Sequence, residues 1–197
     1  KGIGEAFVNA KGISAVVMSL EAYLRKRKLM VTFCEVLYSL VTFYPEGVHQ
    51  VALEVTRTLV KCVKNQKNVD LLEPPLRLLT CLVQDASNVC YANETLQACT
   101  DAIYEHNENR EVLPPLLRIA ILILKSGRVT TDFISSGTIK FACQLCELYD
   151  KDPDVLGYLL GVVCTIAFLS RGDLESLEDF HLCELAMNTQ KAYAKAE

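Results

Sequence analysis

The sequence predicts an all-α protein, an α-solenoid of about four helical repeats. Apolar residues recur at spacings of three and four along most of the chain, and no stretch alternates as a half-buried strand would. Charged turns return with a period near 42 residues, in register with Leu40, Leu82, Leu124 and Ile166. Such a period, with two or three helices in each unit, is typical of stacked repeats that bury their apolar faces against one another.

Composition agrees with this class. The 197 residues are 51% hydrophobic but only 8% aromatic, with no Trp, so aliphatic side chains must fill the core. The net charge is -4, with a mildly basic first half and an acidic second half. Neither half has the clustered basic face that nucleic-acid binding requires. The nine cysteines, an odd number set in apolar patterns, predict reduced core thiols and a cytoplasmic location.

The first repeats are predicted from periodicity and turn residues. Residues 12–24 have one apolar face and end in the basic turn at 25–28, RKRK. Residues 29–43 form a more hydrophobic helix, which Pro and Gly at 44–47 stop. In 48–62, apolar and polar residues occupy opposite faces, which predicts a surface helix.

The middle of the chain continues the plan. After the polar turn at 64–68, Pro74-Pro75 sits in the first turn of a helix that runs through Leu82, where a missing N–H costs nothing. Residues 85–93 are turn-like, and Asn93 is the predicted N-cap of a helix through Ile103.

The last units follow the turn at 106–110. A second Pro-Pro pair starts a helix through Leu124. Residues 129–170 predict a short helix, a break at Gly137, a second helix, a charged turn and a third, almost wholly apolar helix. Residues 171–197 begin a final helical segment.

Residues 133–170 resemble the armadillo repeat. They contain an apolar pair, a small residue and Gly, an apolar helix, a charged turn, and a helix ending in a Leu-x-x-Leu-like run. The resemblance is fair for 10–43 and loose for the two units between 43 and 133. The first of these two, the second unit of the chain, is more like a HEAT hairpin. The resemblance implies a right-handed superhelix. Residues 4–12 look like the end of a helix before a Gly break, and both ends lack an obvious polar capping unit, so we expect a segment of a longer protein. The implied repeats are 1–44, 45–85, 86–127 and 128–170, with a partial terminal unit at 171–197.

The resemblance also implies a concave groove lined by the third helices. Nuclear-import adaptors grip a peptide there with a Trp and an Asn four residues later. The matching positions here are Glu35, Arg77, Ile119 and Gly161 for Trp, and Ser39, Cys81, Ile123 and Thr165 for Asn. Both ladders are missing, which argues against a receptor for nuclear localisation signals. The expected groove residues are Lys28, Thr32, Glu35, Ser39, Arg77, Cys81, Gln84, Ile119, Ile123, Thr165 and Phe168.

Other motifs favour packing over chemistry. Cys143-x-x-Cys146 lacks an evident second ligand pair for a zinc site and the strand that precedes a thioredoxin motif. His181 and Cys183 are candidates for the missing pair, but the sequence does not fix their distance from it. No GxSxG, HExxH or P-loop occurs. We therefore expect no catalysis, cofactor or metal. The charge-free run at 155–169 is shorter than the ~20 residues of a membrane span.

These observations predict a protein-binding scaffold that receives a peptide or helix of a partner along its groove. The basic turn of Arg25, Lys26, Arg27 and Lys28 predicts a solvated loop, or a site for an acidic peptide, phosphate or anionic surface beside the groove. Two alternatives remain open. One is a structural element of a cytoskeletal or ciliary complex, and the other is a regulatory domain of a multidomain enzyme. A nuclear location also stays open.

Overall fold

The computed structural model describes residues 2–9, 11–23, 26–44, 48–129 and 136–169, and every regular element in them is a helix. The α-helices are α1 (Gly2–Asn9), α2 (Gly12–Ala22), α3 (Arg27–Phe43), α4 (Val48–Asn65), α5 (Glu73–Val83), α6 (Ala92–Glu105), α7 (Leu113–Lys125), α8 (Ser136–Leu148) and α9 (Pro153–Leu169). Two short 3-10 helices, η2 (Val69–Leu71) and η3 (Ala86–Asn88), lie before and after α5. The predicted all-α class is confirmed for these residues.

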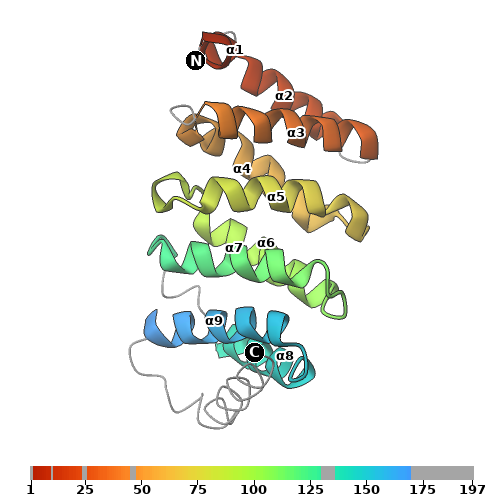
Figure 1. The fold of residues 1–197 in the computed structure, drawn as a ribbon, viewed down its shortest axis with the longest axis vertical. Coiled ribbons are helices and arrows are strands. Elements are labelled where there is room, and N and C mark those ends of the chain that lie inside the picture. The colour runs from red at the N-terminus through yellow and green to blue at the C-terminus, as the bar shows by residue number, and fades with distance from the viewer. Residues whose placement is uncertain (1, 10, 24–25, 45–47, 130–135, 170–197) are drawn as a thin grey trace, which may run out of the picture.

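The helices form two layers. Helices α3, α5, α7 and α9 lie one below another in the layer nearest the viewer in Figure 1, and each contacts the next. Helices α2, α4, α6 and α8 lie behind them, with α4 in contact with both α2 and α6. Each back helix packs on the front helix that follows it in sequence, so the chain advances as a series of helix hairpins.

The core lies between the two layers and continues along the whole stack. Its buried aliphatic side chains extend from Ile13 in α2 to Ile166 in α9. Leu37, Leu79 and Leu116 are fully buried members from three successive hairpins. The predicted repeat boundaries at 45, 86 and 128 fall between α3 and α4, at η3, and after α7. The partial unit at 171–197 lies outside the described residues.

Local signals explain most helix ends. Both Pro-Pro pairs stand in the first turns of α5 and α7, as predicted. The predicted N-cap Asn93 is wrong, because α6 begins at Ala92 and Asn93 lies inside its first turn. Tyr91 adopts the left-handed conformation (φ 53°) just before the helix, and its carbonyl accepts the N–H of Thr95. The backbone turn at Tyr91 therefore starts this helix earlier than the side-chain signal suggests.

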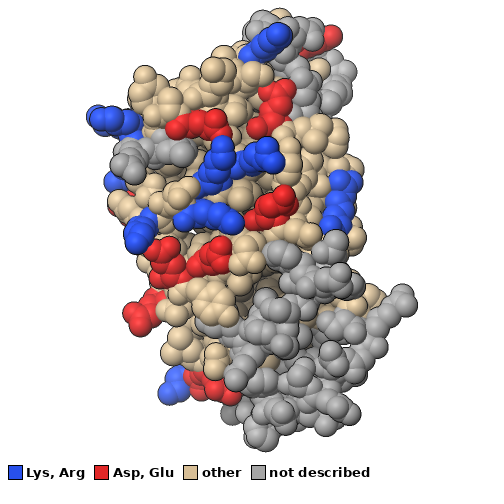
Figure 2. All heavy atoms as spheres, turned by 180° about the vertical axis from the view of Figure 1, so that it is seen from behind, with Lys and Arg blue, Asp and Glu red and all other residues tan. Residues whose placement is uncertain are grey.

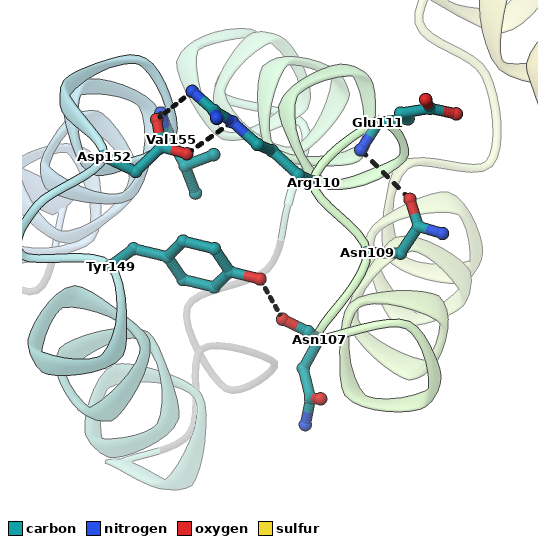
Figure 3. A network of polar contacts seen from close by, with 7 residues as sticks. All are labelled: Asn107, Asn109, Arg110, Glu111, Tyr149, Asp152 and Val155. Atoms are coloured by element: carbon teal, nitrogen blue, oxygen red, sulfur yellow. Dashed lines mark hydrogen bonds and ion pairs between the residues drawn. The ribbon is translucent and has the colours of Figure 1, made fainter.

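The charged turns between back and front helices stack along one edge and bond to one another. Arg27 Nη1 lies 3.4 Å from Asp70 Oδ2, and His106 Nε2 lies 3.4 Å from the Gln66 carbonyl oxygen. Figure 3 shows the next step, where the Tyr149 hydroxyl donates to the Asn107 carbonyl at 2.5 Å. The recurring turns of the sequence thus link neighbouring hairpins as well as reversing the chain.

The thiols of the described cysteines belong mainly to the core. Burial raises the pKa of Cys34, Cys62, Cys99 and Cys146 to about 12, so these groups stay protonated and shielded. Cys164 is exposed. In a Cys183→Ser background, an alkylating reagent at about pH 8, near the ordinary thiol pKa, should modify Cys164 rapidly and these four only after unfolding. Mass spectrometry of the labelled peptides checks this, and rapid native labelling of Cys99 would contradict the packing.

Candidate functional site

An elongated groove of about 690 Å³ crosses the outer surface of the α3, α5, α7 and α9 layer. Its walls come from all four helices and from the turns that precede α5 and α7. Its lining residues are Arg27, Tyr38, Val69, Asp70, Glu73, Leu76, Arg77, Thr80, Cys81, Gln84, Glu111, Val112, Pro114, Pro115, Arg118 and Tyr158. Packed helices have axes ~8–10 Å apart, so the three spacings from α3 to α9 add up to about 25–30 Å. About eight residues of an extended peptide span that length.

The predicted groove residues of the first two units lie on this face. Arg77, Cys81 and Gln84 line the groove itself. Lys28, Thr32, Glu35 and Ser39 are exposed on α3. Ser39 instead lines a second, smaller depression between α1 and α3. The groove thus includes the predicted residues of α5, whereas those of α3 are exposed without lining it.

The prediction for α7 is wrong. Ile119 and Ile123 are fully buried, so they belong to the core and offer nothing to a partner. Arg118 is exposed and lines the groove in place of Ile119, and Leu122 takes the position expected for Ile123. An α-helix turns about 100° per residue, so an error of one residue moves a side chain from the surface to the core.

The prediction for α7 fails because the number of residues between equivalent positions, the step, differs from one repeat to the next. Buried residues of α5 map onto buried residues of α7 at a step of 41, and those of α7 onto α9 at a step of 43. The first set is Leu76, Leu78, Leu79, Leu82 and Val83, which maps onto Leu117, Ile119, Ala120, Ile123 and Leu124. The second is Leu116, Ile119, Ala120 and Ile123, which maps onto Leu159, Val162, Val163 and Ile166. The mean step of 42 is right, but the individual steps place other residues on the outer surface. The equivalent positions of α3, α5, α7 and α9, here called the outer row, are Glu35, Arg77, Arg118 and Gly161.

On α9 the predicted residues have unequal exposure. Phe168 is 83% exposed, whereas Thr165 is half-buried and donates its hydroxyl to the Gly161 carbonyl of its own helix at 2.7 Å. Thr32 does the same to the Lys28 carbonyl on α3. These two hydroxyls are already satisfied within their helices. Of the basic turn, Lys26 and Arg27 are exposed, and Arg25 lies outside the described residues.

Arg77 is held between an acid and an aromatic ring. Its Nη1 lies 3.5 Å from Glu35 Oε1, and its guanidinium carbon lies 4.3 Å from the centre of the Tyr38 ring. The hydrogen bond with Tyr38, followed by the nearby Glu35 and Glu73 carboxylates, raises the pKa of Arg77 above its ordinary value. Arg77 is therefore a fixed and compensated positive charge in the groove.

Arg118 is different. Among the described residues it forms no hydrogen bond, ion pair or ring contact, although it lines the same groove. Pro114, Pro115 and Tyr158 line the groove in this region and bring no charge. The sequence contained a signal for this residue: Arg118 is the only charge between Leu113 and Leu124, and a lone charge on an apolar helix must face solvent. Tyr38, Tyr158 and Glu111 had no such signal.

The opposite face of the molecule is also charged, but in pairs. Figure 2 shows basic side chains lying between acidic ones on this face. Lys61 Nζ lies 2.8 Å from Glu21 Oε1, and Arg57 stacks over the Tyr91 ring at 5.2 Å. Two basic groups of α4 thus contact an acid of α2 and a ring just before α6.

The described part of the chain holds no group of three or more His, Cys, Asp or Glu side chains arranged as metal ligands. Cys143 and Cys146 are buried in α8, and His181 and Cys183 lie outside the described residues. No described helix is both long and apolar enough to cross a bilayer. Comparison with known proteins finds no match to a family model, to a curated protein or to a solved structure.

Proposed function

We propose that this chain is an armadillo-like α-solenoid of about four repeats that acts as a non-catalytic scaffold and binds a partner protein along the groove. The unbridged, buried cysteines support a reducing, cytoplasmic setting. The observation that carries the proposal is the continuity of one groove of mixed polar and apolar lining across α3, α5, α7 and α9.

The lining of the groove favours an extended peptide over a helix. A helix in a groove needs an apolar stripe to receive its apolar face. The burial of Ile119 and Ile123 removes the two side chains of α7 that were expected to form part of such a stripe. Instead the groove offers guanidinium, carboxylate and hydroxyl groups at intervals set by the helix spacing. Polar groups at regular intervals suit successive residues of an extended chain.

Exchange of Glu35 and Arg77 tests the groove while keeping their ion pair. Random peptides of about ten residues, long enough to cross the groove, are displayed and selected on the native chain. The double variant Glu35→Arg/Arg77→Glu should bind the selected peptides about tenfold more weakly, because each charge that a peptide meets is reversed. Its midpoint of thermal unfolding should move by no more than about 2 °C, since the exposed pair is retained.

The matched control is the exchange Lys67→Glu/Glu105→Lys. This pair is also exposed and lies 4.0 Å apart, away from the groove. It should leave peptide binding unchanged. Equal loss in both variants, or no loss in the groove variant, would show that the groove is not the binding surface.

An assembly role is the second candidate. Phe43 is 80% exposed and lines an apolar depression of about 300 Å³ with Phe7, Val36 and Tyr44, beside α1. An exposed apolar patch near one end of the stack is what end-to-end assembly requires. Concentration-dependent self-association that Phe43→Glu abolishes, together with an inert groove, would favour this role.

A further inference from the structure

The groove is lined by three basic and three acidic residues, Arg27, Arg77, Arg118, Asp70, Glu73 and Glu111, but Arg118 forms no ion pair among the described residues. The register of the core places Glu35, Arg77, Arg118 and Gly161 in one outer row across α3, α5, α7 and α9. Arg77 binds Glu35, the member before it. Arg118 is followed by Gly161, which has no side chain and lies against Ile121 of α7, whose Cδ1 would be 3.0 Å from an added Cβ. The only acid of this row is therefore used by Arg77, and Arg118 receives no counter-charge from it.

An acidic row runs parallel to this one but does not reach Arg118. Asp70, Glu111 and Asp154 occupy corresponding positions near the starts of α5, α7 and α9, and all three are exposed. Asp70 is paired with Arg27. Glu111 lies in the turn before α7 and lines the same groove, but no ion pair joins it to Arg118. Among the described residues Glu111 forms no side-chain ion pair, so the groove presents both signs of charge in separate rows.

We propose that Arg118 is the anchor for one carboxylate of an extended partner segment that crosses α7 in this groove. The proposal rests on the proposed peptide-binding function and specifies its ligand. A guanidinium presents a planar fork of donors that matches a carboxylate with two hydrogen bonds. Tyr158 on α9 lines the same groove and supplies a hydroxyl.

The acidic row limits how acidic the partner can be. A segment with many carboxylates would place some of them against Glu111, Asp154 and Asp70, where like charges repel. The ligand is therefore a segment with a single Asp or Glu at the position over Arg118 and neutral or basic residues on either side. This separates it from a polyacidic tail, which a simple basic patch would attract.

Peptide selection on three proteins tests this. The native chain, Arg118→Glu and the control Lys64→Glu are each used to select displayed random peptides of about ten residues, which can cross the groove. Lys64 is exposed on α4, and its reversal changes the net charge of the protein equally. Because Arg118 and Lys64 are both exposed, neither change should alter the unfolding midpoint, and thermal melts check this.

The native and Lys64→Glu proteins should enrich peptides with one aligned Asp or Glu. Arg118→Glu should enrich Lys or Arg at that position and bind the native-selected peptides about tenfold more weakly. If the selected peptides bind the Glu35→Arg/Arg77→Glu variant more weakly but share no aligned acid, the role of Arg118 is overturned and the groove function still stands. Polyacidic peptides from the native chain would overturn the single-carboxylate ligand. A selection that enriches nothing would overturn both proposals.

Discussion

Ile119→Ala is expected to lower the free energy of unfolding by about 3 kcal/mol, whereas Arg118→Ala should change it by less than about 0.5 kcal/mol. Ile119 is fully buried between the layers, so truncation removes apolar contacts and leaves a cavity. Arg118 is exposed and has no partner among the described residues, so its truncation removes almost nothing that folding forms. Urea denaturation followed by far-ultraviolet circular dichroism measures both changes.

The two residues are adjacent, which makes the pair a direct test of the register of α7. A constant step of 42 residues would put Ile119 on the surface and reverse the order of the two effects. A second control is Leu53→Ala, since Leu53 is 47% exposed on α4 and its loss should be small. Equal, small effects at Ile119 and Arg118 would contradict the described packing.

Asp152→Ala is expected to lower the free energy of unfolding by about 2 kcal/mol, because one carboxylate serves two elements. Asp152 Oδ2 lies 2.6 Å from Arg110 Nε, and Oδ1 lies 3.2 Å from Arg110 Nη2, which makes a two-point ion pair between successive turns (Figure 3). Oδ1 also accepts the N–H of Val155 at 3.4 Å, at the start of α9. The Asp152 side chain is only 13% exposed, whereas its partner Arg110 is 69% exposed, so the carboxylate is the shielded half of the pair.

Asp70→Ala is the matched control. Its carboxylate pairs with Arg27 between the preceding turns, but both side chains are 63% exposed, so the expected loss is below about 1 kcal/mol. Asp152→Asn should lose less than Asp152→Ala, because Asn also caps a helix start. A double-mutant cycle with Arg110→Ala isolates the ion pair. Equal losses for Asp70→Ala and Asp152→Ala would show that the burial of Asp152 does not matter.

Much of this fold can be predicted from the sequence because its signals are local and repeated. The apolar spacing defines the helices, and Pro-Pro pairs and charged turns mark their ends. The register of α7 could not be predicted from the average period, since steps of 41 and 43 also average 42. A helix as apolar as 113–124 gives few polar positions from which to orient it. Arg118, the only charged residue in this stretch, is the one position that indicates which face of the helix meets solvent.

The groove was harder to predict than the helices. Arg77, Cys81 and Gln84 follow from the outer row of α5, but Tyr38, Glu111 and Tyr158 enter the groove from flanking positions and a turn. Whether a charge is paired depends on side chains about 40 residues away, as with Arg77 and Glu35. A one-dimensional pattern contains no information on that pairing. The difference between Arg77 and Arg118 therefore becomes visible only in three dimensions.

The bonded turns along one edge also determine how the stack can bend. Each successive pair of turns is joined there, through Arg27 and Asp70, His106 and Gln66, and Arg110 and Asp152. Stretching this edge would break those bonds, whereas bending about it leaves them intact. The opposite edge is joined as well between the turns after α5 and α7, where Arg128 donates to the Val89 carbonyl at 2.8 Å and to the Ser87 carbonyl at 3.2 Å. We therefore expect α5 and α7 to keep their spacing at both ends, so that a bound peptide meets Arg77 and Arg118 at a fixed separation.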